Sequence, residues 1–221
     1  MKNSMNIEQA RFNMIEQQIR PWDVLDAGVL SLLAVVRRED FVPPACEALA
    51  FMDTEIPLAG GQAMLAPRVE ARLLQELKVA RHEKVLEVGT GSGFMAALLG
   101  HKAQRVISLE INAELAAMAT ANLKRAGVMN VSVLNQDGAA GLPGEAPFDV
   151  ILLSGSVAEV PAALVAQLKV GGRLAAIVGA LPVMRAQLVT RVGESDFRTT
   201  TLFDTVAPRL QGFVQRNAFA F

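Results

Sequence analysis

Residues 84–110 read KVLEVGTGSGFMAALLGHKAQRVISLE, and this stretch decides the fold. An apolar run ends in glycines at positions 89, 91 and 93, a helical stretch follows, and a second apolar run ends at Glu110. The pattern predicts a buried strand, a tight turn, a helix and a second strand parallel to the first. Glycine suits such a turn because it adopts positive φ and lets a ligand approach the backbone closely. The N-terminus of the following helix adds N–H groups that point toward the same ligand.

The same alternation of apolar runs and helical stretches continues after Glu110. The further apolar runs VSVLNQ, FDVILLS and RLAAIVG are separated by helical stretches that begin at Asn112 and near Pro161. Runs rich in Val, Ile and Leu are typical of parallel strands that helices cover on both faces. Residues 185–191 and 197–206 flank a glycine turn, which predicts an antiparallel pair at the sheet edge. We therefore expect a Rossmann-like α/β fold with a mostly parallel, doubly wound sheet.

The first 66 residues differ from the rest because helical periodicity and turn residues replace the strand pattern. Apolar residues at helical spacing predict a first helix through residues 7–15, and a second helix from about Asp26 to Val36 begins at an aspartate cap. Residues 55–67, EIPLAGGQAMLAP, are interrupted by prolines and glycines. This composition predicts a loop.

Pro67 marks the start of the next helix, because proline is favoured in the first helical turn. The apolar residues that follow form a stripe that ends near Lys78. We expect one domain over residues 1–221, in which residues 1–66 form a helical cover and a loop and residues 67–221 form the α/β core.

Composition limits the kind of protein that this chain can be. The hydrophobic share is 52% and the charged share 19%, values typical of a folded domain with a sizeable core. Lys and Arg number 21 against 22 Asp and Glu, so no net positive charge favours a nucleic-acid partner. No apolar stretch approaches the roughly 20 residues of a membrane span. One cysteine, Cys46, and two scattered histidines predict neither a disulfide nor a metal site.

The start of the chain, MKNSMNIEQARF, lacks a basic region followed by an apolar one, so it does not resemble an export signal. Together with the single cysteine, this predicts a cytoplasmic protein. We expect neither nucleic acid nor membrane among its partners.

Three groups of residues at the carboxyl ends of successive predicted strands point to a cofactor site. The turn Gly89, Thr90, Gly91, Ser92, Gly93 has the pattern G-x-G-x-G, and Glu110 ends the second strand, where a carboxylate can accept both hydroxyls of a ribose. Asp137 and Gly138 follow the third strand and would border an adenine. Open α/β sheets bind ligands at this edge. Phe94 stands where a dinucleotide site has its third glycine, so the pattern favours S-adenosyl-L-methionine.

Each of the three groups has an ordinary explanation when taken alone. A glycine turn can bind no ligand, a strand-end acid can simply face water, and Asx-Gly is a common turn. A dinucleotide oxidoreductase remains a distant alternative. It is disfavoured by Phe94 and by the lack of a recognisable acid or base for hydride transfer.

Beyond the glycine turn, the chain resembles the protein-L-isoaspartate O-methyltransferase family along nearly its whole length. The resemblance covers RFNMIEQQIR, RREDFVPPACEALAFMDTEIPL, GQAMLAP, VLEVGTGSGFMAALL, GVMNVSVLNQDG, APFDVILLSGSVAEVP, LKVGGRL and TVAPRLQG. It implies transfer of a methyl group from S-adenosyl-L-methionine to the α-carboxylate of isoaspartyl residues, with S-adenosyl-L-homocysteine as product. The implied partner is a protein or peptide that carries isoaspartyl residues. The resemblance also implies that Ser154 and Ser156 line the substrate channel.

The loop before Pro67 departs from the family pattern, which is close to G-Q-T-I-S-Q-P. Here Gln62 is retained, but Ala63 replaces the threonine and Leu65 replaces the active-site serine. The resemblance places Gln62, Ala63 and Leu65 at the substrate, and it leaves no catalytic residue to assign. A hydroxyl that binds a carboxylate contributes about 1.5–3 kcal/mol, so we expect slower or redirected transfer.

Two alternatives therefore stay open beside isoaspartyl methylation. One is a methyltransferase of the same fold that acts on a different acceptor. The other is a protein that binds the cofactor without transferring the methyl group. The sequence does not distinguish these two, and it does not indicate the oligomeric state.

Overall fold

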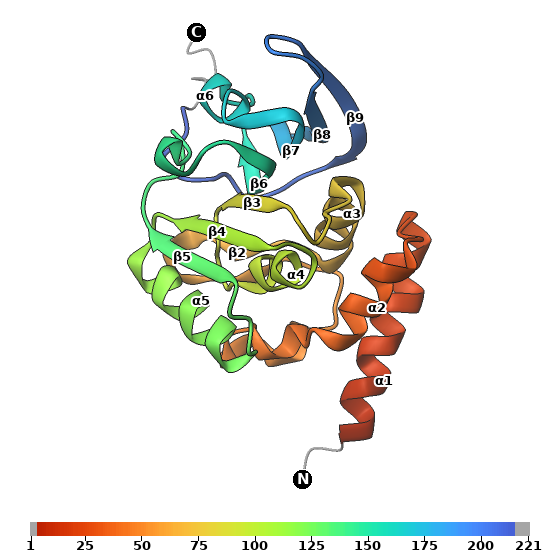
Figure 1. The fold of residues 1–221 in the computed structure, drawn as a ribbon. Coiled ribbons are helices and arrows are strands. Elements are labelled where there is room, and N and C mark those ends of the chain that lie inside the picture. Colours follow the sequence, from red (N-terminus) through yellow and green to blue (C-terminus); the bar gives the residue numbers. More distant parts are fainter. Residues whose placement is uncertain (1–3, 215–221) are drawn as a thin grey trace, which may run out of the picture.

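A seven-stranded sheet forms the centre of the computed structural model, which describes residues 4–214 (Figure 1). The strand order is β5-β4-β3-β6-β7-β8-β9. Neighbours from β5 to β7 pair in parallel, whereas β8 pairs antiparallel with both β7 and β9. The strands are β3 Lys84–Val88, β4 Arg105–Glu110, β5 Val131–Asn135, β6 Phe148–Val157, β7 Leu168–Ala180, β8 Val183–Arg191 and β9 Phe197–Thr205. The predicted mostly parallel sheet and its antiparallel edge are confirmed.

Both faces of the central strands β3, β4 and β6 are buried, as their apolar runs predicted. The edge strands β5 and β9 contain no fully buried residue, so the prediction of cover on both faces is wrong for the run VSVLNQ, because a strand at the sheet edge has fewer neighbours. Val85 and Leu86 are neighbours in β3, and each is fully buried in a different apolar cluster. One cluster includes side chains of α2 (Ala27–Val35), α3 (Pro67–Leu77) and α4 (Phe94–Lys102), and the other includes Leu164 of α6 (Ala162–Val165). The helix α5 (Ala113–Arg125) joins β4 to β5. Side chains alternate in direction along a strand, so a strand covered on both sides is expected to be mostly apolar.

The amino-terminal region is helical, as predicted. α1 covers Ser4–Met14 and continues as a π-helix Ile15–Ile19 and a 3-10 turn Arg20–Trp22. Asp26 caps α2 by accepting a hydrogen bond from the Val29 N–H at 2.8 Å. Two more 3-10 segments, Arg38–Asp40 and Pro44–Leu49, lead toward the sheet. Figure 1 shows α1 and α2 on one side of the molecule, where α2 contacts α3 and α4.

The segment predicted as a loop is more ordered than its composition indicates. It contains a short antiparallel hairpin, β1 Ile56–Pro57 and β2 Ala63–Met64, joined through a 3-10 turn Ala59–Gly61. Gly60 and Gly61 have φ angles of 66° and 71°, which glycine adopts readily. These two glycines therefore form the tight turn of a hairpin, and the segment is not an irregular loop. α3 begins at Pro67, and its predicted stripe is buried at Val69, Leu73, Leu74 and Leu77.

Two smaller elements complete the described chain. A 3-10 turn, Pro143–Glu145, lies between β5 and β6. Within residues 4–214, no helix combines the length and the apolar character that crossing a membrane requires.

Candidate active site

The turn between β3 and α4 requires glycine at all three predicted positions. Gly89, Gly91 and Gly93 have φ angles of 92°, 55° and 87°, a region that side chains other than glycine rarely adopt. A Cβ on Gly93 would lie 3.3 Å from the backbone of Ala119 in α5. Thr90 and Ser92, between the glycines, are buried. The turn is therefore closely packed against neighbouring residues. A ligand at the turn would contact mainly its backbone groups.

Glu110 lies next to this turn, as the strand pairing predicted. One of its carboxylate oxygens accepts the Gly91 N–H at 2.8 Å, and the other accepts the Asn112 N–H at 3.0 Å. Only 4% of Glu110 is exposed. A carboxylate has about four lone-pair positions, so acceptor capacity remains after these two bonds.

Gly138 closes the same edge of the sheet. It is buried, and a Cβ there would lie 2.3 Å from a methyl group of Val88. Asp137 is exposed and accepts the Ala139 N–H at 2.9 Å, an Asx turn. The structure brings Gly89, Glu110 and Gly138 to one small cavity, which we call the Glu110 cavity. Its lining is Gln62, Val88, Gly89, Leu109, Glu110, Ile111, Gly138, Leu210 and Gln211.

A second small cavity, the Ser154 cavity, shares Gly89 with the Glu110 cavity. The turn residues 89–92 and Ser154 form one part of its wall, and the segment before α3 forms another. Its lining is Ala63, Met64, Leu65, Glu70, Gly89, Thr90, Gly91, Ser92, Phe94, Met95 and Ser154. The predicted substrate loop and the predicted cofactor turn therefore meet at this point.

A fully buried acid, Glu87, is connected to the glycine turn through a network of hydroxyl groups. Its carboxylate accepts hydrogen bonds from the hydroxyls of Ser108 at 2.6 Å and Ser154 at 2.7 Å. The Thr90 hydroxyl lies 2.6 Å from that of Ser108 and extends the network to the turn. Burial raises the pKa of Glu87 to about 7, and the negative charges of Glu110 and Glu70 add to this, while the two hydroxyls oppose it. The sequence analysis missed this residue, although an acid inside the apolar run VLEVG is a visible signal.

A buried ion pair holds the segment before α3. Arg38 and Glu70 pair with each other, and Arg38 also donates to the Leu65 carbonyl at 2.9 Å. Their side chains are 1% and 5% exposed. Burial raises the pKa of Glu70 above its usual value, although Arg38 opposes that shift. The pair fixes the backbone at Leu65, and sequence reasoning did not find it because 32 residues separate its members.

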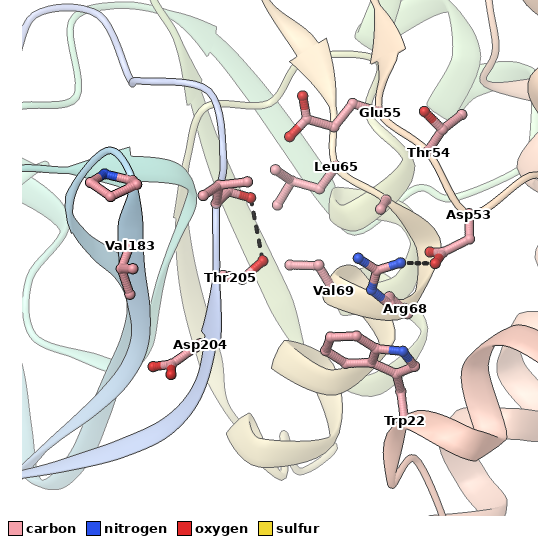
Figure 2. A pocket seen from close by; sticks show the side chains of 13 residues that line it. Trp22, Asp53, Thr54, Glu55, Leu65, Arg68, Val69, Val183, Asp204 and Thr205 are labelled. Atoms are coloured by element: carbon pink, nitrogen blue, oxygen red, sulfur yellow. Dashed lines mark hydrogen bonds and ion pairs between the residues drawn. The ribbon is translucent and has the colours of Figure 1, made fainter.

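A third cavity is larger than these two and has a volume of about 570 Å³ (Figure 2). We call it the Trp22 cavity. It is lined by Trp22, Asp53, Thr54, Glu55, Leu65, Ala66, Arg68, Val69, Pro182, Val183, Asp204, Thr205 and Val206. Leu65 lines both the Trp22 cavity and the Ser154 cavity, so this side chain stands where the two meet.

The predicted serines have different surroundings. Ser154 lines the Ser154 cavity and donates to Glu87. Ser156 is fully buried, and its hydroxyl donates to the carbonyls of Ala207 at 2.9 Å and Pro208 at 3.2 Å. Ser156 therefore holds the segment after β9 against β6.

Gln62 lines the Glu110 cavity, and Ala63 and Leu65 line the Ser154 cavity. Within residues 4–214, no group of three or more His, Cys, Asp or Glu side chains is placed to hold a metal ion.

Comparison with known sequences identifies close relatives. The pattern of the family described as protein-L-isoaspartate(D-aspartate) O-methyltransferase matches residues 9–206. A protein-L-isoaspartate O-methyltransferase of Koribacter versatilis is 41% identical over 194 residues, which are 88% of this chain and 87% of the relative. The protein of the same name from Methanoculleus marisnigri is 41% identical over 169 residues, 76% of this chain and 77% of the relative.

Comparison with solved structures gives the same architecture. A Plasmodium falciparum structure, described as a protein-L-isoaspartate O-methyltransferase in complex with S-adenosyl-L-homocysteine, aligns with a TM-score of 0.76 and 20% identity. The alignment covers 92% of this chain and 97% of that one. A second protein-L-isoaspartate O-methyltransferase structure also gives 0.76, at 24% identity, covering 91% of this chain and 66% of the other. The expected Rossmann-like fold is confirmed.

Proposed function

Because the chain belongs to the protein-L-isoaspartate(D-aspartate) O-methyltransferase family, we propose that it methylates the α-carboxylate of isoaspartyl residues in proteins and peptides. The donor is S-adenosyl-L-methionine, and the product is S-adenosyl-L-homocysteine. The family match over residues 9–206 carries this proposal. That range contains the glycine turn, Glu110 and every residue that lines the Trp22 cavity.

The residues at the sheet edge fit this cofactor. We propose that the turn residues Gly89, Thr90, Gly91, Ser92 and Gly93 hold it, that Glu110 accepts its ribose hydroxyls and that Asp137 and Gly138 border its adenine. Two observations support the assignment: a Cβ would not fit at Gly138 without displacing Val88, and Glu110 retains acceptor capacity. When bound, the cofactor supplies a methyl group on a positively charged sulfur.

The chain itself has to bind and align the acceptor. A carboxylate with a reference pKa near 4 is already ionised at neutral pH, so the reaction needs no general base. What remains is orientation and exclusion of water, which together contribute several kcal/mol in well-aligned reactions. We propose that the acceptor enters through the Trp22 cavity and reacts beside Leu65, with Ala63 and Ser154 near the transfer point. Gln62, which the sequence placed at the substrate, lines the Glu110 cavity instead. We leave Ser156 outside this site because its hydroxyl is already bonded to the backbone.

The proposal extends to the setting of the reaction. Proteins or peptides with isoaspartyl residues are the partners, and the balanced charge supports neither nucleic acid nor a membrane surface as a partner. We also propose a cytoplasmic location and a single domain in which residues 1–66 cover residues 67–221.

A second candidate is methylation of a different acceptor, and one observation favours it. Ala63 and Leu65 give the Ser154 cavity no hydroxyl at the two positions that the family pattern uses. An apolar wall penalises an unpaired carboxylate because the charge loses its solvation there.

Base treatment of the product distinguishes the two candidates. The protein is incubated with methyl-labelled S-adenosyl-L-methionine and an isoaspartyl peptide, and the product is then treated with mild base. A carboxyl methyl ester releases its label as methanol, as the proposal expects. Transfer of label to another nucleophile, stable to mild base, would favour the second candidate.

A further inference from the structure

Of the described residues that line the Trp22 cavity, Arg68 alone carries a positive charge. It lies in the first turn of α3, three residues after Leu65. Its guanidinium stacks over the Trp22 ring at 4.3 Å from the ring centre and forms an ion pair with Asp53. Figure 2 shows Arg68 in the cavity between Trp22 and Asp53, with Leu65 close by. A cation thus stands beside the side chain at which the two cavities meet.

An acceptor carboxylate in this cavity needs a partner for its charge. Ala63 and Leu65 offer none, the hydroxyl of Thr205 already donates to the Val206 carbonyl at 3.3 Å, and the hydroxyl of Thr54 carries no charge. Three other residues of the lining, Asp53, Glu55 and Asp204, are acids that repel an anion. Arginine presents five N–H donors in a planar fork that matches a carboxylate. Arg68 is therefore the group in this cavity that can compensate the charge of the acceptor.

The contacts of Arg68 leave its Nε donor unused. Its Nε is buried and forms no hydrogen bond within the described residues, and neither does the buried Oδ1 of Asp53. The side chain is 27% exposed, so a ligand in the cavity can reach it. Burial lowers the pKa of Arg68 below its usual value, which agrees with a guanidinium that is only partly compensated.

We propose that Arg68 binds the acceptor carboxylate and replaces the two hydroxyls that this chain lacks. Asp53 occupies the guanidinium while the cavity holds no substrate and competes with the acceptor for it. This inference rests on the proposed function, because it assumes that the acceptor is a carboxylate. It makes Arg68 a substrate-binding residue whose loss weakens binding of the acceptor and leaves the cofactor site intact.

Substitution of Arg68 tests the proposal through the Michaelis constant. We expect Arg68→Met to raise KM for an isoaspartyl peptide at least roughly tenfold, since a charge-assisted bidentate contact is lost. Affinity for S-adenosyl-L-homocysteine, measured by calorimetry, should stay within about threefold of the unmodified protein. Arg105→Met is the control, because Arg105 is an arginine that pairs with Glu145 and lines none of the cavities described above. An unchanged KM in a folded Arg68→Met variant would overturn the proposal.

Asp53→Asn is a second variant, with an effect of opposite sign. If Asp53 competes for the guanidinium, its neutralisation should lower KM by roughly two- to fivefold. If the Asp53–Arg68 ion pair only stabilises the packing of Trp22 against α3, Asp53→Asn lowers the melting temperature and does not lower KM. That result would count against the proposal even if Arg68→Met failed to fold.

Fluorescence separates this proposal from the proposed function. Trp22 is the only tryptophan of the chain and lies under Arg68, so its emission reports on ligands at the guanidinium. With S-adenosyl-L-homocysteine present, an isoaspartyl peptide should give a saturable change, and the same peptide with its α-carboxyl amidated should give none. A carboxylate-dependent signal without methyl transfer would support Arg68 binding and contradict the proposed function. Equal signals from both peptides would contradict the role of Arg68.

Discussion

The two sides of Leu65 are built in different ways. On the side proposed for the cofactor, backbone geometry dominates: three glycines with positive φ, the Gly91 N–H bonded to Glu110, and a turn held by the Glu87 network. On the side proposed for the acceptor, side chains from segments far apart in the sequence surround a cavity of about 570 Å³. The cofactor side tolerates little change because its shape is in the main chain. The acceptor side can change specificity through single side chains while the fold persists.

The largest effect on this difference between the two sides is expected from a substitution in the glycine turn. Gly91→Val forces a β-branched residue to φ 55°, at a cost of at least about 1–2 kcal/mol, and places side-chain atoms where the ligand approaches. We expect binding of S-adenosyl-L-homocysteine to weaken by more than roughly 100-fold, measured by calorimetry. Gly127→Val is the control, because Gly127 also has positive φ (71°) but has open space around it. Wild-type affinity in Gly91→Val would refute the assignment of the turn.

Glu110→Gln tests the acid that joins the turn to the next strand. The amide keeps one acceptor oxygen where the carboxylate has two, so one of the bonds from the Gly91 and Asn112 N–H groups is lost. A hydrogen bond to a charged group is worth about 1.5–3 kcal/mol, so we expect affinity for S-adenosyl-L-homocysteine to fall about 10- to 100-fold. Glu114→Gln, at an exposed position in α5, should leave it unchanged. Equal affinities in the two variants would remove Glu110 from the site.

Restoring the two missing hydroxyls tests whether their absence limits methyl transfer. We expect Ala63→Thr combined with Leu65→Ser to raise methyl transfer to an isoaspartyl peptide by roughly tenfold or more, since a hydroxyl bonded to a carboxylate contributes about 1.5–3 kcal/mol. Leu65 is only 4% exposed, so the variant must first be shown to fold by its melting curve. Leu65→Ala is the control, because it removes the same bulk without adding a hydroxyl. A gain as large in that control would show that space, and not hydrogen bonding, limits the reaction.

The smallest expected effect is a pH dependence of stability from Glu87. Its pKa rises from 4.5 unfolded to about 7 folded, so the folded state binds the proton more tightly. Its contribution to stability is complete below the unfolded pKa and is lost as pH rises through about 7. Relative to Glu87→Gln, the free energy of unfolding should fall by up to about 1.4 kcal/mol per pH unit in this window.

Urea unfolding at several pH values measures this difference. Glu70, which also faces Glu87, is unchanged in both proteins and largely cancels. Parallel pH profiles for the two proteins would contradict the burial argument for Glu87.

The difference between the two sides also explains which features the sequence predicted. Glycines 89, 91 and 93, the Asp26 cap and the start of α3 at Pro67 are local signals, and the structure confirms their conformations. The hairpin within residues 55–67 was missed because β1 and β2 have only two residues each. The pairs Arg38–Glu70 and Asp53–Arg68 form between segments that only the folded chain brings together. A sequence pattern gives no distance between such residues, so the acceptor cavity could not be assembled from it.

The most direct measurement of the central claim is the transfer of labelled methyl groups to two matched peptides. One peptide contains isoaspartate and the other contains aspartate at the same position, and kcat/KM is determined for both. The proposed function predicts clear transfer to the isoaspartyl peptide and little or none to the aspartyl peptide. Absence of transfer to the isoaspartyl peptide, in a protein that binds S-adenosyl-L-homocysteine, would contradict it.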